Sequence, residues 1–101
     1  MPASQVYTPL QIQTILQPVF AAHRVRRAVL FGSYAKGQAG PHSDVDLLVD
    51  SGLRGLAFFG LLEDVVTSLD KPVDLLDTSQ LTADSPVHRE IQTSGVVIYE
   101  C

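Results

Sequence analysis

The chain has 101 residues, of which 46% are hydrophobic, enough for the packed core of one domain spanning residues 1–101. Its longest apolar run is far shorter than the roughly 20 residues of a membrane-spanning helix, and its N-terminus lacks a secretory signal, so we expect a cytoplasmic protein without a membrane partner. The net charge of -4 argues against direct nucleic-acid binding, because such binding needs a basic surface that displaces counterions.

The N-terminal half of the chain predicts one helix and two short strands. Thr8 and Pro9 form an N-cap followed by a proline at the first helical position. Apolar residues then recur at helical spacing, and Pro18 predicts a kink or a break in this helix. Residues 28–31 and 45–49 are rich in β-branched and large apolar side chains, which is typical of buried strands.

The C-terminal half predicts a second helix over residues 53–69, and its apolar residues cover more than a narrow stripe. We expect most of them in the core and a smaller part on a partner surface. They are Leu56, Phe58, Phe59, Leu61, Leu62, Val65, Val66 and Leu69.

The remaining elements alternate between strand and helix. Residues 73–76 read as a strand, and Ser85 followed by Pro86 starts a short helix that ends near residue 93. Residues 96–99 read as the last strand, and the only cysteine, Cys101, is expected to be an exposed thiol. The order of elements therefore predicts an α/β (α+β) fold, a small sheet backed by helices.

Two aspartates separated by one residue, Asp44 and Asp46, stand at the start of the second strand. Because side chains alternate between the faces of a strand, both carboxylates point the same way, about 7 Å apart. The two carboxylates repel each other and resist burial, which favours a cation between them. Asp44 by itself is also typical of a turn. Asp74 lies inside the third strand and completes the oxygen-rich site that Mg²⁺ prefers if the two strands are neighbours.

Gly32 and Ser33 follow the first strand and fit a phosphate-binding turn. The glycine lets a phosphate approach the backbone, while the serine hydroxyl and the amides at the start of a short following helix point at the anion. By itself this pattern is common. Lys36 is a candidate phosphate contact, with a solvated lysine as the alternative.

Other charged residues are expected outside the site. Arg24, Arg26 and Arg27 form a basic cluster before the first strand, which is either a solvated face or a contact to a triphosphate or an acidic partner. Asp50 and Asp77 stand at strand ends and are expected in loops.

The spacing of these motifs resembles a known signature. Gly32-Ser33, ten intervening residues and then Asp44-Val45-Asp46 resemble the motif of the DNA polymerase β-like nucleotidyltransferase superfamily. The similarity is greatest to the minimal nucleotidyltransferases, the MNT or MntA antitoxins. The segments GSYAKG, SDVDLLV, VDLLD and GVVIYE carry it, so it covers nearly the whole chain.

This resemblance implies a mixed sheet of about four strands flanked by helices, and a two-metal nucleotidyl transfer. Carried over by position, Asp44, Asp46 and Asp74 would bind Mg²⁺, two ions in all, and Asp74 would also orient or deprotonate the acceptor hydroxyl. The triphosphate of ATP would lie at the residues Gly32 and Ser33, to which we add Lys36 as a candidate.

The resemblance also implies a partner, a HEPN-domain ribonuclease toxin that is silenced when AMP is transferred from ATP to one of its tyrosines. Two alternatives remain open. One is an antitoxin that masks its toxin stoichiometrically without catalysis. The other is a small-molecule nucleotidyltransferase, such as one that adenylylates an aminoglycoside, although a domain to hold such an acceptor is not expected in 101 residues.

Overall fold

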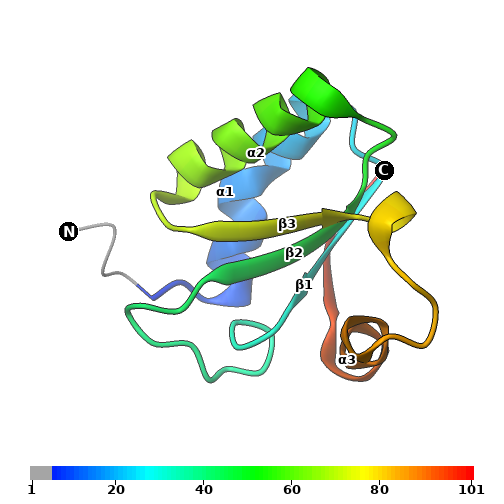
Figure 1. Ribbon diagram of the computed structural model, residues 1–101. Helices are drawn as coiled ribbons and strands as arrows, with labels where there is room; N and C mark the ends of the chain where they lie inside the picture. Colours follow the sequence, from blue (N-terminus) through cyan, green and yellow to red (C-terminus); the bar gives the residue numbers. More distant parts are fainter. Residues whose placement is uncertain (1–5) are drawn as a thin grey trace.

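A computed structural model describes residues 6–101 of the protein (Figure 1). Its strands form one mixed sheet in the order β3-β2-β1-β4, in which β1 runs antiparallel to β2 and β4, and β2 runs parallel to β3. The expected fold class is thereby confirmed. The elements in chain order are α1 (Pro9–Ala22), β1 (Arg27–Phe31), β2 (Val45–Asp50), α2 (Gly55–Leu69), β3 (Val73–Asp77), the short 3-10 helix η2 (Thr78–Gln80), α3 (Pro86–Ser94) and β4 (Val96–Glu100).

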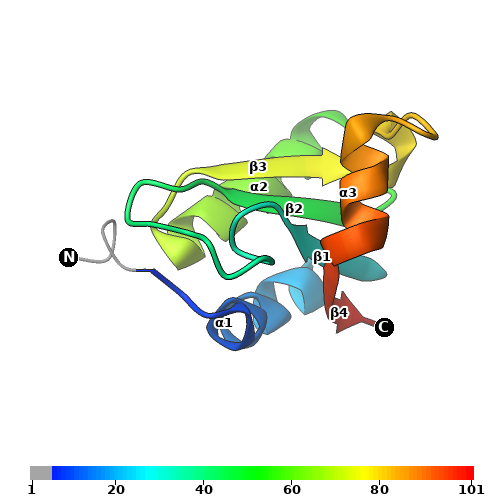
Figure 2. The same cartoon turned by 90° about the horizontal axis from the view of Figure 1, so that it is seen from below.

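The two faces of the sheet are covered differently (Figures 1 and 2). Helices α1 and α2 lie side by side on one face and enclose the main core, in which Ile12, Leu47 and Leu61 are fully buried. Helix α3 lies on the opposite face, where a smaller apolar cluster contains Val29 and Leu48. That second face is only partly covered, and it carries Asp46 of β2 and Asp74 of β3, whereas Asp77 of β3 alternates to the face that α1 and α2 cover.

Local signals set the ends of the helices. The Gln11 N–H donates to Thr8 Oγ1 at 3.1 Å and the Thr8 N–H donates to Gln11 Oε1 at 2.8 Å, which is a complete capping box. At the start of α3 the His88 N–H donates to Ser85 Oγ at 3.2 Å. Both predicted caps are therefore confirmed.

Helix α1 passes through Pro18 as one element, so of the predicted kink or break the break is wrong, and the kink stays a prediction. The exposed proline removes one hydrogen bond from the helix. On either side of it, Leu16 and Phe20 are fully buried against the sheet and α2. Tertiary packing therefore holds the helix together across a residue that disfavours it locally.

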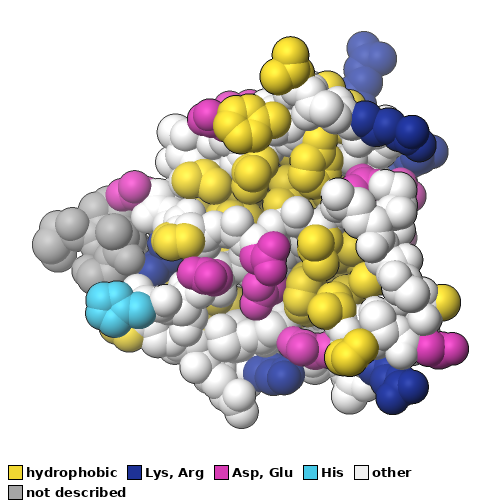
Figure 3. Space-filling view, viewed as in Figure 1, with side chains coloured by type: hydrophobic (Ala, Val, Ile, Leu, Met, Phe, Trp, Pro, Cys, Tyr) yellow, Lys and Arg dark blue, Asp and Glu magenta, His cyan; other side chains and the backbone are white. Residues whose placement is uncertain are grey.

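Helix α2 begins at Gly55, two residues later than expected, and its wide apolar face is divided by exposure. Leu61, Val65 and Leu69 are buried, whereas Leu56 and Phe59 are 89% and 54% exposed. Figure 3 shows hydrophobic side chains on this part of the surface. The core assignment is thus confirmed for one side of the helix, and the partner surface stays a prediction.

Two further observations concern the surface of the protein. Cys101 is exposed, as expected. Within residues 6–101, no helix combines the length and the apolar character required to cross a membrane.

Candidate active site

The parallel pairing of β2 and β3 brings two acidic residues together. Asp46 and Asp74 are partners in the register of these strands, and Phe31 is the partner of Asp46 on the other side, in β1. Asp44 lies just before β2 and is exposed, as is Asp74, while Asp46 is half-buried. Acidic side chains gather in the middle of this face, beside hydrophobic ones (Figure 3). The sheet therefore assembles the three aspartates that sequence reasoning selected.

Asp46 is electrostatically the most perturbed of these groups. Burial of its carboxylate, followed by the negative charges of Asp74, Asp44 and Glu90, raises its pKa from 3.8 to about 6. All four influences act in the same direction. A cation near these carboxylates would therefore be bound favourably, because it offsets their mutual repulsion.

Gly32 lies against Asp46, which explains why the turn and the acidic motif occur together. The backbone at Gly32 has φ +74, in the left-handed region that favours glycine, and a Cβ atom there would overlap the Asp46 carboxylate. The missing side chain thus makes room for a site carboxylate. This role was not expected from the sequence, which suggested room for a phosphate.

The segment after Gly32 forms turns and not the expected short helix. The Lys36 N–H donates to the Gly32 carbonyl at 3.2 Å and the Gln38 N–H donates to the Ser33 carbonyl at 2.9 Å. Gly37, with φ +72, directs the chain out of this single helical turn. A phosphate at Ser33 would therefore meet the amides of a turn, without the dipole of a full helix.

Helix α3 adds a fourth carboxylate that sequence reasoning missed. Val87 and Ile91 of α3 pack on the apolar cluster of the sheet, and the helical spacing places Glu90 beside them. Lys36 Nζ lies 3.7 Å from Glu90 Oε2, and both side chains are partly exposed. The helical spacing of Val87 and Ile91 is visible in the sequence. Only the position of α3 on the sheet, however, shows that Glu90 faces the aspartates.

Two hydrogen bonds hold the connection that leads to Asp44. Lys71 is 3% exposed, and its Nζ donates to the Pro41 carbonyl at 3.1 Å. Within the connection the Gly40 N–H donates to Ser43 Oγ at 2.9 Å. These bonds define the path of the chain just before Asp44.

The basic cluster does not join the site. Arg24, Arg26 and Arg27 are exposed at the start of β1, the end of that strand opposite to Gly32. Arg26 Nη2 lies 3.3 Å from Asp50 Oδ1, and Arg27 Nε lies 4.0 Å from Glu100 Oε2. The solvated-face reading fits this geometry.

Asp50 and Asp77 are the last residues of β2 and β3, so the prediction that they lie in loops is wrong. Asp77 is 5% exposed. Its Oδ1 accepts from Ser51 Oγ at 2.6 Å and the Ser51 N–H at 3.1 Å, and its Oδ2 accepts from Ser79 Oγ at 2.7 Å and the Ser79 N–H at 3.0 Å. Burial alone would raise its pKa, but the bonds from Ser51 and Ser79 outweigh burial and lower it.

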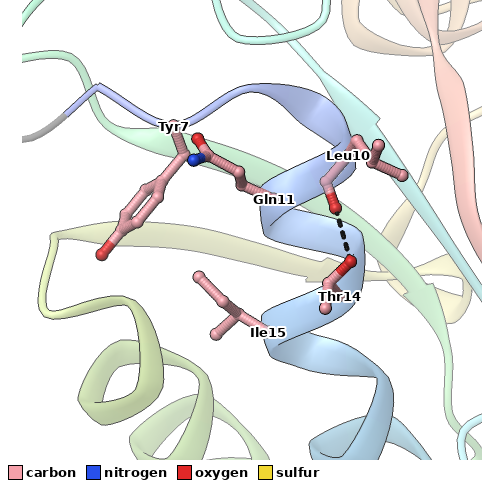
Figure 4. A pocket seen from close by; sticks show the side chains of 5 residues that line it. All are labelled: Tyr7, Leu10, Gln11, Thr14 and Ile15. Carbon is pink, nitrogen blue, oxygen red and sulfur yellow. Dashed lines mark hydrogen bonds between the residues drawn. The ribbon is translucent and has the colours of Figure 1, made fainter.

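A hollow of about 390 Å³ lies on α1, on the opposite face of the sheet from the acids (Figure 4). Inside it the Thr14 Oγ1 donates to the Leu10 carbonyl at 3.0 Å. Its lining has no charged side chain, so it offers no phosphate or metal chemistry. The lining residues are Tyr7, Leu10, Gln11, Thr14 and Ile15.

The three aspartates suit an open magnesium site. Among residues 6–101, no group of three or more acidic, histidine or cysteine side chains is arranged so that it could hold a metal ion by itself. Mg²⁺, however, commonly keeps several waters and takes one or two carboxylates together with phosphates of the substrate. The hard oxygen donors of Asp44, Asp46 and Asp74, and the repulsion that a cation would relieve, fit such an ion.

Residues 11–101 match the family described as Polymerase beta, Nucleotidyltransferase. The chain belongs to this family. A nucleotidyltransferase relative in Methanocaldococcus jannaschii, provisionally named a protein adenylyltransferase, is 35% identical over 69 residues, which are 65% of this chain and 73% of the relative.

Solved structures of toxin–antitoxin complexes have the same fold as this nucleotidyltransferase. One complex with AMP-PNP has a TM-score of 0.75 at 22% identity, over 88% of this chain and 73% of that chain. Another is a tri-AMPylated Shewanella oneidensis HEPN toxin with its MNT antitoxin, with a TM-score of 0.69 at 19% identity, over 93% and 74% of the two chains. At these identities the likeness shows a shared fold, and the family itself is shown by the match of residues 11–101.

Proposed function

We propose that this nucleotidyltransferase is an antitoxin that transfers AMP from ATP to a tyrosine hydroxyl of a HEPN-domain ribonuclease toxin and so neutralises it. The adenylyltransferase name of the archaeal relative and the AMP-PNP and AMPylated-toxin complexes support this assignment. The observation in this chain that carries it is the register pairing of Asp46 with Asp74, beside Asp44 and the Gly32-Ser33 turn.

In the proposed reaction the acceptor oxygen attacks the α-phosphorus of ATP. A new oxygen–phosphorus bond forms, the bond from the α-phosphorus to the bridging oxygen of the β-phosphate breaks, and pyrophosphate leaves. The proton of the hydroxyl goes to a carboxylate, for which Asp74 is the candidate. Asp74 is exposed and stands on β3, an edge strand of the sheet, so a hydroxyl carried by another protein can approach it.

The other side chains have binding roles in this proposal. Two Mg²⁺ ions at Asp44, Asp46 and Asp74 would supply acidification of the acceptor hydroxyl and charge stabilisation on the leaving pyrophosphate. The turn at Gly32 and Ser33 would hold the triphosphate through backbone amides and the serine hydroxyl, and Lys36 would add a positive charge.

The test is intact-mass spectrometry of the cognate HEPN toxin after incubation with this protein, ATP and Mg²⁺. We expect the toxin mass to increase by whole AMP units, and peptide mapping to place them on tyrosine. The double variant Asp44→Asn/Asp46→Asn, which replaces two carboxylates by amides of the same shape, is expected to leave the toxin unmodified.

The same experiment separates the alternatives. A toxin that is inhibited without any gain in mass would establish a stoichiometric, non-catalytic antitoxin. Transfer of AMP to an aminoglycoside, with an unmodified toxin, would establish a small-molecule enzyme. The cytoplasmic location stays a prediction that cell fractionation can test.

A further inference from the structure

Glu90 occupies a place at the active site that no sequence motif assigns. The apolar side of α3, with Val87 and Ile91, packs against Val29, Phe31 and Leu48 on the acid-bearing face of the sheet. Figures 1 and 2 show α3 lying against this face. The carboxylate of Glu90 therefore comes from a different element than the three aspartates.

The partner of Glu90 is the lysine that follows the Gly-Ser turn. Lys36 Nζ lies 3.7 Å from Glu90 Oε2, with 42% and 34% of the two side chains exposed. The pair thus connects the turn with α3, above the half-buried Asp46 that Glu90 also influences through its charge. Because both groups remain accessible to solvent, a stronger anion can displace Glu90 from Lys36.

We propose that Glu90 competes with the nucleotide for Lys36: it holds the ammonium group in the free protein and yields it to the triphosphate on binding. Glu90 then weakens nucleotide binding, through repulsion of the phosphates and through occupation of Lys36. The inference rests on the proposed function in that a nucleoside triphosphate is the ligand.

Calorimetric titration with AMP-PNP and Mg²⁺ tests this on the protein alone, without a toxin. Glu90→Gln is expected to bind the nucleotide about two- to fivefold more tightly, the range of an exposed ion pair. Lys36→Met is expected to bind it more weakly. In the Lys36→Met background, Glu90→Gln should lose more than half of its effect, because the pair that it breaks is already absent.

Glu63→Gln is the matched control, because Glu63 is an exposed acid on α2, on the opposite face of the sheet. It removes the same charge and is expected to leave binding unchanged. Weaker binding by Glu90→Gln, or an equal effect of Glu90→Gln with and without Lys36, would overturn the competition. Absence of binding by the wild-type protein would overturn the proposed function as well, whereas wild-type binding that Glu90→Gln leaves unchanged would overturn only the role of Glu90.

Discussion

Asp46 and Asp77 stand at opposite ends of the same pair of strands, and their environments are opposite as well. Asp77 is buried but receives four hydrogen bonds from Ser51 and Ser79, which lower its pKa. Asp46 is half-buried, and burial together with three neighbouring carboxylates raises its pKa to about 6. At one end of the strand pair hydrogen bonds stabilise the negative charge of the carboxylate. At the other end further negative charges surround the carboxylate.

The difference separates a structural carboxylate from a candidate catalytic one. The carboxylate of Asp77 accepts hydrogen bonds from Ser51 and Ser79, and the bond from the Ser79 N–H caps η2. Asp46 gains nothing from its three acidic neighbours, so the fold tolerates it at a cost in stability. Such a cost is expected where a ligand with positive charge completes the arrangement.

The largest expected effect is the loss of catalysis on neutralising Asp46. Asp46→Asn should lower the rate of AMP transfer about a thousandfold, because metal-assisted charge stabilisation is worth several kcal/mol. Asp50→Asn is the control on the same strand, four positions away at the opposite end, and should retain the rate. A steady-state assay of toxin modification measures both, and equal rates for Asp46→Asn and wild type would exclude the metal role.

A second comparison uses two glycines with nearly the same left-handed backbone conformation. Gly32 and Gly37 have φ +74 and +72, but only at Gly32 would a Cβ meet another side chain, that of Asp46. Gly32→Ala and Gly37→Ala should each lose about 1 kcal/mol of stability from the left-handed backbone. Only Gly32→Ala should also slow transfer, by about a hundredfold, since it displaces Asp46. Equal rates of the two variants would show that the contact does not position Asp46.

Neutralising Asp77 should lower the stability of the fold and leave AMP transfer intact, which is the reverse of the effect expected for Asp46. Asp77→Asn leaves serine donors facing an amide group, and we expect the free energy of unfolding to fall by about 2 kcal/mol. Urea unfolding at neutral pH measures this, with Asp50→Asn as the control, for which about 0.5 kcal/mol or less is expected. Transfer activity should persist while Asp77→Asn is folded, and its specific loss would place Asp77 in the site after all.

The smallest expected effect is on the pH dependence of stability in metal-free buffer. Because the pKa of Asp46 is raised from 3.8 to about 6 in the folded state, the folded protein binds a proton more tightly than the unfolded chain between these values. Wild-type stability should therefore decrease as the pH rises from about 4 to 7, by an amount on the order of 1 kcal/mol after solvent screening. Asp46→Asn should lack this decrease, and parallel pH profiles of the two proteins would contradict the shift.

Local signals were sufficient for most elements of the fold. The caps at Thr8 and Ser85 act within a few residues, so they were visible before the structure. Of the kink or break predicted at Pro18, the break was wrong because the burial of residues on both sides, which is a tertiary effect, outweighs one lost hydrogen bond.

The site could be predicted only in part, because the contacts among its residues are also tertiary effects. Strand alternation put Asp44 and Asp46 on one face, but their proximity to Asp74 was conditional on which strands are neighbours. The contribution of Glu90 depends on where α3 packs, and the satisfaction of Asp77 depends on Ser51 from another segment of the chain. None of these is a property of a short window of sequence.

The sequence by itself determined most of the helices and strands, the family, and the residue types able to bind a metal and a triphosphate, because caps, periodicity and motif spacing are local. Only the tertiary structure decided which carboxylates meet. The parallel register of β2 and β3 sets Asp74 beside Asp46, the packing of α3 brings Glu90 to Lys36, and the backbone of Gly32 makes room for the Asp46 carboxylate. Charges interact through space, so their effect depends on contacts between segments that are distant in the chain.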